Sequence, residues 1–252
     1  GEVSEWQPRV VELAAGKRVP VTWNTPRYVA VPGMTALCKA MATGLIVHRA
    51  QRVTGVNRQA CKWTVTLEDG ATKSGYDWVL STAPAEQSAL LLKDLTNWND
   101  IEMQGCYSLM LGFDEDIGLP FDAAVVRNNP LAWIADNSSK PGRSGKPAVL
   151  CQSDNDWAEP WMEADQKEVE RQLCDSFVAL TGAVLSLARY VSLHRWRFAK
   201  VSRPAPDRFL LDPDAQTGAA GDWCGRGRVE SEFESAEALA SAVLEVTNLQ
   251  AA

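Results

Sequence analysis

The spacing of apolar residues predicts mostly short strands in the first third of the chain, with one helix among them. Two strands are predicted at residues 6–13 and 17–23, on either side of a turn that contains Gly16. Pro32 and Gly33 then open a segment in which apolar residues recur at helical spacing. The apolar positions of this predicted helix are Met34, Leu37, Cys38 and Met41.

Strand patterns return after this helix and continue to residue 80. Residues 45–56 and 61–75 are predicted to be extended, and Asp69-Gly70 in the second segment is a strong hairpin signal. A short buried strand follows at 78–80, and it stops at a turn of small residues that ends with Pro84.

The middle of the chain is predicted to be mainly β, with one clear helix. Four strand candidates are separated by turns rich in Gly, Pro and Asn, at 106–113, 123–127, 131–137 and 146–153. A helix is predicted after Asp165, which can cap it together with Glu168, and Gly182 ends it. Its apolar face comprises Val169, Leu173, Phe177 and Leu180.

A long strand, a glycine-rich turn and a helix complete the pattern. On the strand at 188–201, alternate residues share a face, so Tyr190, Ser192, His194, Trp196 and Phe198 lie together. A short strand near 208–212 leads to the turn Gly-Ala-Ala-Gly-Asp-Trp-Cys-Gly-Arg-Gly-Arg at 218–228. The apolar stripe of the final helix is predicted to be Val229, Phe233, Ala236, Ala240 and Val243.

Composition and charge narrow the classes of function. The 252 residues are 46% hydrophobic and 23% charged, which is the balance of an ordinary globular protein of one or two domains. The net charge of −7 argues against nucleic acid or an anionic membrane as the main partner, since both attract basic surfaces. We therefore expect a small-molecule substrate, while the oligomeric state stays open.

The pattern of cysteines indicates a reducing compartment, and the small number of histidines argues against a metal site. The six cysteines are scattered without a Cys-x-x-Cys pair, so we expect free thiols and a cytoplasmic protein. With only two histidines, His48 and His194, a zinc site is not expected.

The glycine-rich turn at 218–228 is the strongest candidate for chemistry. A helix N-terminus presents unpaired N–H groups and a partial positive charge, and glycines let a ligand approach the backbone closely. Residues 225–230 read Gly-x-Gly-x-x-Glu, which departs from the dinucleotide fingerprint because Glu230 replaces Gly or Ala. A glycine-rich surface loop before a capped helix is the alternative interpretation.

Three segments taken in order resemble a known family. They are Tyr-Val-Ala-Val-Pro-Gly-Met at 28–34, Trp-Val-Leu-Ser-Thr-Ala-Pro-Ala-Glu-Gln at 78–87, and Gly-Asp-Trp-Cys-Gly-Arg-Gly-Arg-Val-Glu at 221–230. Together with His-Arg-Trp-Arg-Phe-Ala at 194–199, they resemble the flavin-dependent amine oxidoreductases, and most closely the bacterial renalase-like branch. The family begins with a βαβ unit that carries Gly-x-Gly-x-x-Gly. No such motif precedes Trp6, so we expect a member without that unit, which puts strong FAD binding by this chain alone in doubt.

The resemblance implies a set of FAD contacts. Val53 would meet the adenine through its backbone, and the turn after the strand at 78–80 would line the cofactor. The final helix would direct its N-terminus to the pyrimidine edge of the flavin, where a reduced flavin carries negative charge. The implied cofactor-binding residues are Val53, Thr82, Ala83, Pro84, Gly221, Asp222, Arg228, Val229 and Glu230.

The resemblance also places His194 and Trp196 at the substrate. Each has a structural alternative, since a single strand histidine is more often a hydrogen-bonded structural residue and a tryptophan is usually core. Cys224, beside the Gly-Asp pair, is interpreted as a packing residue and not as a site of covalent flavin attachment.

The resemblance implies an α/β fold, with part of an FAD/NAD(P)-binding domain at 26–84 and 205–252. An antiparallel-sheet substrate domain would comprise 1–25 and 85–204. The implied activity is hydride transfer from an amine or a dihydronicotinamide to flavin N5, with O2 as acceptor. The alternative function is a cofactor-free remnant of the flavin fold that acts as a binding or structural module.

Overall fold

The computed structural model describes residues 2–143 and 145–251, which form two compact units. The first comprises residues 1–47 and 105–197, and the second comprises residues 48–104 and 198–252. Residues 26–47, which the resemblance assigns to the FAD-binding part, lie in the first unit. Compactness does not show which residues hold a cofactor, so the division into cofactor and substrate domains stays a prediction.

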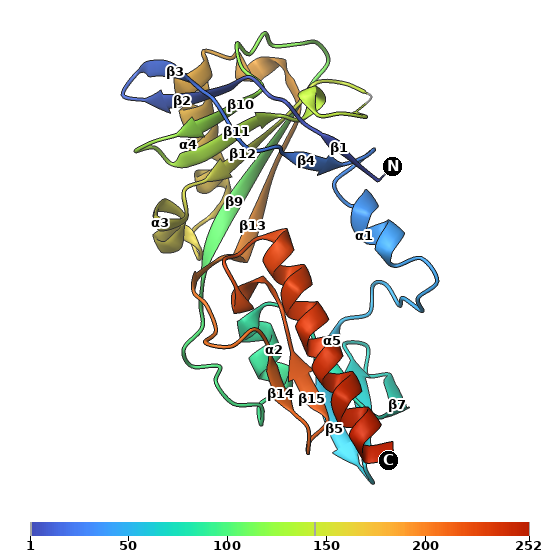
Figure 1. Cartoon of the computed structure of the whole chain (residues 1–252). Helices are drawn as coiled ribbons and strands as arrows, with labels where there is room; N and C mark the ends of the chain where they lie inside the picture. The colour runs from blue at the N-terminus through green and yellow to red at the C-terminus, as the bar shows by residue number, and fades with distance from the viewer. Residues whose placement is uncertain (1, 144, 252) are drawn as a thin grey trace. The chain divides into compact units, whose positions relative to one another are not determined.

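A seven-stranded sheet forms the centre of the first unit (Figure 1). Its strand order is β13-β9-β12-β11-β10-β2-β3. Strands β9, β12, β11 and β10 pair antiparallel in turn, β10 pairs parallel with β2, and β2 pairs antiparallel with β3. The strands are β2 (Val10–Ala14), β3 (Lys17–Val21), β9 (Glu102–Phe113), β10 (Ala123–Val126), β11 (Leu131–Asp136), β12 (Ala148–Ser153) and β13 (Ala188–Arg203). The first two predicted strands, the four of the middle segment and the long strand at 188–201 are thereby confirmed.

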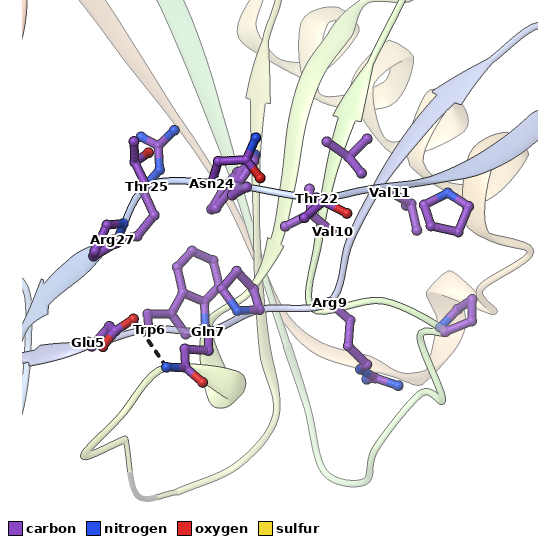
Figure 2. A pocket seen from close by; sticks show the side chains of 16 residues that line it. Glu5, Trp6, Gln7, Arg9, Val10, Val11, Thr22, Asn24, Thr25 and Arg27 are labelled. Atoms are coloured by element: carbon purple, nitrogen blue, oxygen red, sulfur yellow. Dashed lines mark hydrogen bonds between the residues drawn. The ribbon is translucent and has the colours of Figure 1, made fainter.

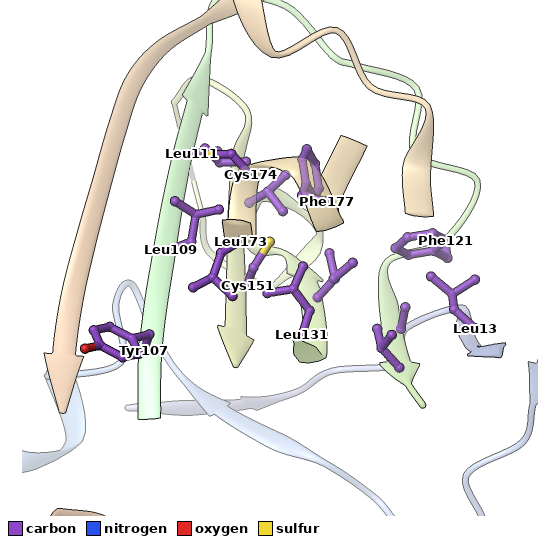
Figure 3. Close-up of a cluster of buried hydrophobic side chains, with 14 of the residues drawn as sticks. Leu13, Tyr107, Leu109, Leu111, Phe121, Leu131, Cys151, Leu173, Cys174 and Phe177 are labelled. Atoms are coloured by element: carbon purple, nitrogen blue, oxygen red, sulfur yellow. The ribbon is translucent and has the colours of Figure 1, made fainter. Parts of the chain in front are cut away.

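Helix α4 (Gln166–Thr181) covers one face of this sheet (Figure 3). Asp165 accepts hydrogen bonds from the amides of Lys167 and Glu168, and Gly182 ends the helix in the left-handed region at φ 71°. The side chains that α4 buries against the sheet are Val169, Leu173, Cys174 and Phe177. The predicted cap, end and apolar face of this helix are confirmed, except that Leu180 is only partly buried.

Smaller elements complete the first unit. Strands β1 (Val3–Glu5) and β4 (Tyr28–Ala30) pair with each other. The short helices are α3 (Asn155–Ala158), η1 (Asn137–Ser139), η2 (Glu159–Trp161) and η3 (Leu185–Leu187). The predicted helix after Pro32 is only α1 (Ala36–Met41), and it buries none of its residues. Met34 and Met41 are more than half exposed, so the spacing there did not identify a packed face.

The second unit contains two three-stranded sheets and two helices. One sheet is an antiparallel meander of β5 (Val53–Gln59), β6 (Lys62–Leu67) and β7 (Thr72–Tyr76), which turns at Asp69-Gly70 as predicted. Residues 45–52 were expected to be extended but form no strand. The other sheet has the order β14 (Leu210–Asp212), β15 (Thr217–Ala219) and β8 (Val79–Ser81). Helices α2 (Ala85–Leu91) and α5 (Val229–Ala251) follow β8 and the turn after β15, with the 3-10 turn η4 (Asp222–Cys224) between β15 and α5.

Helix α5 buries a different face from the one predicted. Val229 and Phe233 are 70% and 53% exposed, whereas Ser235 and Leu239 are buried at 3% each. The hydroxyl of Ser235 donates to the main-chain oxygen of Arg208 and accepts the amide of Gly221. Leu239 packs where Gly218 has no side chain, because a Cβ there would lie 2.8 Å from its Cδ1. The spacing of apolar residues did not predict the buried face of α5, because α5 packs through Ser235 and against Gly218, and neither residue is a large apolar one.

The fold class is α/β, as the sequence predicted. No helix within the described residues is long and apolar enough to cross a membrane.

Candidate functional site

The two turns predicted to meet a cofactor follow adjacent parallel strands. β8 and β15 pair in parallel, with Ser81 opposite Ala219. The amide of Ala220 donates to the oxygen of Ser81, and the indole nitrogen of Trp223 donates to the oxygen of Ala83 at 3.1 Å. Ligands of open α/β sheets bind beyond the carboxyl ends of such strands. The strand at 78–80 and the strand that leads into the turn at 218–228 were predicted to border the same cofactor cleft. Their pairing brings the two turns together, and the shared cleft stays a prediction.

A pocket of about 750 Å³ lies beside β8 and is lined by three of the predicted residues, Val53, Thr82 and Ala83. Its size is typical of ligand sites. The remaining lining is mainly apolar and comprises Arg52, Thr54, Val56, Val65, Val79, Leu80, Ser81, Gln87, Leu90, Leu91 and Leu92.

The contribution of α2 to this pocket was missed from the sequence. Pro84 was interpreted as the end of a turn, but it is the N-cap of α2, and Gln87, Leu90 and Leu91 line the pocket. The run Ala-Glu-Gln-Ser-Ala-Leu-Leu after Pro84 is the signal that could have identified this helix, because Pro near a helix start is followed here by good helix formers.

The glycine-rich turn holds its shape through bonds of its own. The amides of Gly225 and Gly227 both donate to the oxygen of Asp222, and the amide of Arg226 donates to the hydroxyl of Ser231. A Cβ on Gly225 would lie 2.7 Å from that of Ser231, and Gly227 has a φ of +67°. The glycines at 225 and 227 therefore serve close packing and a left-handed turn, and they do not keep the backbone open to a ligand as expected.

The N-terminus of α5 is where donors remain. The helix begins at Val229, so Glu230 lies in its first turn and Arg228 directly precedes it. No hydrogen bond among the described residues engages the amides of Arg228, Val229 or Glu230. All three residues are exposed. These amides form a ready site for a negatively charged or electron-rich group.

Two carboxyl groups near these turns are perturbed by burial. Burial raises the pKa of Asp222, although main-chain amides of Asp222 and Trp223 partly offset the shift. Burial also raises the pKa of Glu86 in the first turn of α2, and one of its oxygens, Oε2, is buried without a hydrogen-bond partner. At a given pH, each of these carboxyl groups is therefore protonated to a greater extent than an exposed carboxyl group would be.

Cys224 lies in the same turn and is chemically quiet. Burial, the largest cause, raises the pKa of its thiol to about 11, so the reactive thiolate is scarce at neutral pH. Its partly buried side chain packs against the hydrophobic cluster around Trp223 and Leu210. This geometry suits the predicted packing role.

His194 and Trp196 lie in the first unit, on one face of β13. Their rings are 4.1 Å apart between centroids and inclined by 62°, so the contact is edge-on. The indole nitrogen of Trp196 donates to the hydroxyl of Ser108 on β9 at 3.1 Å. Trp196 is 51% exposed, and His194 is also exposed, so neither is a core residue. The two residues are available to a ligand.

A second pocket of about 670 Å³ lies in the first unit, between the segment around Trp6 and that around Asn24 (Figure 2). Its tryptophans are already engaged. Trp6 is 7% exposed and contacts Trp23 edge-on, while Trp23 stacks on Trp133 at 5.9 Å and carries Arg27 on its ring. This pocket contains none of the predicted site residues, and its aromatic rings serve packing.

The described residues contain no cluster of three or more His, Cys, Asp or Glu side chains that could hold a metal ion. All six cysteines are free.

Comparison with known protein families finds a match over most of the chain. The family model of the flavin containing amine oxidoreductases matches residues 13–244.

Several solved structures with the same fold are described as oxidases. A protein from Exiguobacterium sp. 255-15 assigned as a protoporphyrinogen oxidase has 12% identity and a TM-score of 0.65, and the match covers 86% of this chain and 52% of that one. Putrescine oxidase bound to putrescine has 12% identity and a TM-score of 0.60, covering 85% and 54%. Cyclohexylamine oxidase from Brevibacterium oxydans IH-35A has 13% identity and a TM-score of 0.58, covering 79% and 48%. The chain spans about half the length of these structures, which share its FAD/NAD(P)-binding fold.

Proposed function

The chain belongs to the flavin containing amine oxidoreductase family, and from that premise we propose that it serves an FAD-dependent oxidoreductase. The proposed reaction moves a hydride from a small substrate to flavin N5, with O2 as the acceptor. The observation that carries the proposal is the parallel pairing of β8 with β15, which brings the turns at 82–84 and 220–222 together. Thr82 and Ala83 of the first turn line a ligand-sized pocket, whereas residues 220–222 do not line it.

The residues of the second unit suit a flavin nucleotide. Val53, Thr82 and Ala83 offer a largely apolar wall for flat ring systems, and the free amides at the start of α5 offer donors to an electron-rich edge. FAD supplies the hydride-accepting ring when it is bound, while the protein supplies position and electrostatics. Thr82 to Pro84 would line the cofactor, and the positive end of α5 would favour negative charge near Arg228, Val229 and Glu230.

Gly221 and Asp222 have distinct parts in this proposal. The amide of Gly221 is already bonded to Ser235, so its contribution is the extended backbone that sets the turn. The half-buried carboxyl of Asp222 would bond ribityl hydroxyls, which are neutral partners. A carboxyl whose pKa is raised tolerates such an environment because it can both accept and donate a hydrogen bond.

The substrate would meet His194 and Trp196 in the first unit. Both side chains are exposed on the same face of β13 and need no rearrangement to touch a ligand. The substrate is an amine or a dihydronicotinamide. The His-Arg-Trp-Arg-Phe-Ala motif and the Gly-Asp-Trp turn favour the renalase-like branch and hence the dihydronicotinamide, whereas the names of putrescine oxidase and cyclohexylamine oxidase favour an amine.

The cellular setting follows from the thiols and charge. Six free cysteines favour a reducing compartment, so we propose a cytoplasmic protein. The acidic balance favours a small-molecule substrate over nucleic acid or an anionic membrane.

A second candidate function is a cofactor-free module with the flavin fold. The turn at 222–227 favours it, since four of its amides, those of Cys224, Gly225, Arg226 and Gly227, are already bonded within the chain and need no ligand. The two functions differ in whether flavin is bound and reduced.

The visible spectrum of the purified protein tests the proposal. After incubation with FAD and gel filtration, bound flavin is expected to give absorbance near ~450 nm. Anaerobic addition of a dihydronicotinamide dinucleotide or of a primary amine should bleach that band, and air should restore it with release of hydrogen peroxide. Protein that carries no flavin after this treatment would support the cofactor-free module instead.

A further inference from the structure

Three side chains form an exposed aromatic patch on β13, here defined as Tyr190, His194 and Trp196. All three lie on the face formed by alternate residues, and Tyr190 and Trp196 are 56% and 51% exposed. Large exposed rings on one face of a strand are unusual unless they meet another molecule.

Trp196 is held in place although half of its surface is exposed. Its indole nitrogen donates to Ser108 Oγ at 3.1 Å, and Ser108 is 5% exposed on the neighbouring strand β9. The edge-on contact with His194, at 4.1 Å between centroids, sets the tilt of the ring. A buried acceptor and an edge-on neighbouring ring thus fix an indole that would otherwise change rotamer freely.

The cations nearest in sequence are directed away from the patch. Arg195 donates to the main-chain oxygen of Met162, and Arg197 forms an ion pair with Glu163. By contrast, Arg27 lies 4.5 Å from the ring centre of Trp23 and Lys140 lies 5.3 Å from that of Trp6. No arginine or lysine of the described residues covers Trp196, so its electron-rich face is open to a ligand.

We propose that Ser108 is the positioning residue of the aromatic patch, and that the Trp196 face it presents binds a flat, positively charged ring. The indole is the best of the aromatic side chains for such a cation. Ser108 acts through its hydroxyl, which accepts the indole N–H and does not itself touch the ligand. The inference rests on the proposed contact of Trp196 with a dihydronicotinamide substrate, whose neutral ring becomes a flat nicotinamide cation once it has given up its hydride.

N-methylnicotinamide chloride is a suitable probe, because it is a flat cation that quenches tryptophan fluorescence on stacking. It is titrated into the full chain, and the affinity is measured by calorimetry and by the quenching lost in Trp196→Phe. Ser108→Ala should weaken binding about fivefold, the effect of one hydrogen bond on the orientation of the ring. Ser108→Thr keeps the hydroxyl and should restore binding to near the original value.

Two controls separate positioning from a general loss of structure. Ser192 lies on the same face of β13 as the patch, and its hydroxyl makes no hydrogen bond within the described residues, so Ser192→Ala should leave the affinity unchanged. In a Trp196→Phe background no indole N–H remains, so Ser108→Ala should have no further effect. This cycle needs only relative affinities among folded variants, as judged by circular dichroism.

Two results would overturn the inference: equal affinity in wild type and Ser108→Ala, or an equal additional loss from Ser108→Ala in the Trp196→Phe background. The flavin spectrum separates this test from the proposed function. Protein that binds no flavin but keeps the Ser108-dependent affinity refutes the oxidoreductase and supports the positioning role. If the protein binds flavin but its affinity for the probe is the same with and without the Ser108 hydroxyl, the positioning role is refuted and the oxidoreductase proposal is supported.

Discussion

Trp223 and Ala83 are 140 residues apart in the chain, and the indole nitrogen of one donates to the main-chain oxygen of the other at 3.1 Å. Trp223 is 1% exposed and packs against Trp98, with 5.5 Å between ring centroids. Ala83 lines the pocket beside β8. This hydrogen bond therefore joins the two turns proposed to hold the cofactor and fixes the pocket wall.

Replacing Trp223 with Phe should remove this bond and keep most of the packing. The oxygen of Ala83 then keeps only the hydroxyl of Ser88 as a donor, and we expect a loss of about 1 kcal/mol, or roughly 2–4 °C in Tm. Trp223→Ala should cost more, about 3–5 kcal/mol, because it also leaves a cavity. Thermal unfolding measures both. Trp157→Phe is the control, since the Trp157 indole nitrogen has no hydrogen bond within the described residues, and an equal effect there would contradict this account.

Glu86 predicts a dependence of stability on pH. Its folded-state pKa is raised by burial, so the folded protein holds this proton to higher pH than the unfolded chain. The group therefore costs no stability below its unfolded pKa of about 4.3, and it lowers the unfolding free energy as the pH rises through the folded value. Glu86→Gln should raise the Tm at pH 7 and leave it nearly unchanged at pH 4, which thermal unfolding at the two pH values measures.

The matched control for Glu86 is Glu68→Gln. Glu68 is exposed and pairs only with Arg52 at 3.6 Å, so its substitution should have little effect at either pH. A Glu86→Gln variant that is less stable at pH 7 than at pH 4, relative to wild type, would show that the buried carboxylate is stabilising.

Ser235 should be essential for docking α5. Its hydroxyl accepts the Gly221 amide at 3.1 Å and donates to the Arg208 oxygen at 2.7 Å, and the residue is 3% exposed. Ser235→Ala leaves the amide of the buried Gly221 and the oxygen of Arg208 without this partner, which should cost about 1–3 kcal/mol. Ser241→Ala on the exposed side of the same helix should be neutral. Denaturant unfolding of the two variants distinguishes the docking serine from the surface one.

These residues show how far the sequence could predict the fold and the site. α4 and the strands of the first unit were predictable because apolar residues recur with a clear period and Asp165 and Gly182 mark the helix ends. The two small-residue turns predicted that these strands border one cleft, but the parallel pairing of β8 with β15 itself was not predicted. The buried face of α5 was not, because Ser235 and Gly218 carry no apolar signal. Several apolar residues between 33 and 47 are exposed in the structure, so their helical spacing did not show that they pack against another element.

Val229→Pro tests the helix N-terminus. The Val229 amide has no partner within the described residues and its side chain is 70% exposed, so Pro at this first helical position should change the unfolding free energy by less than about 0.5 kcal/mol. The substitution removes one of the three free donors. If the flavin edge binds there, FAD affinity should fall about fivefold, as for one hydrogen bond. Unchanged affinity and unchanged reduction rate would remove α5 from the proposed site.

The central claim is that the pocket beside β8 and the adjoining turns bind FAD, and a direct titration tests it. FAD is added to the purified chain and binding is followed by calorimetry, with Ala83→Leu to narrow the pocket and Ala89→Leu as the control, since Ala89 lies on α2 but does not line it. We expect saturable binding of one FAD per chain, weakened at least tenfold by Ala83→Leu, about 1.4 kcal/mol, and unaffected by Ala89→Leu. No binding by the wild type, or equal binding by the two variants, would contradict the claim.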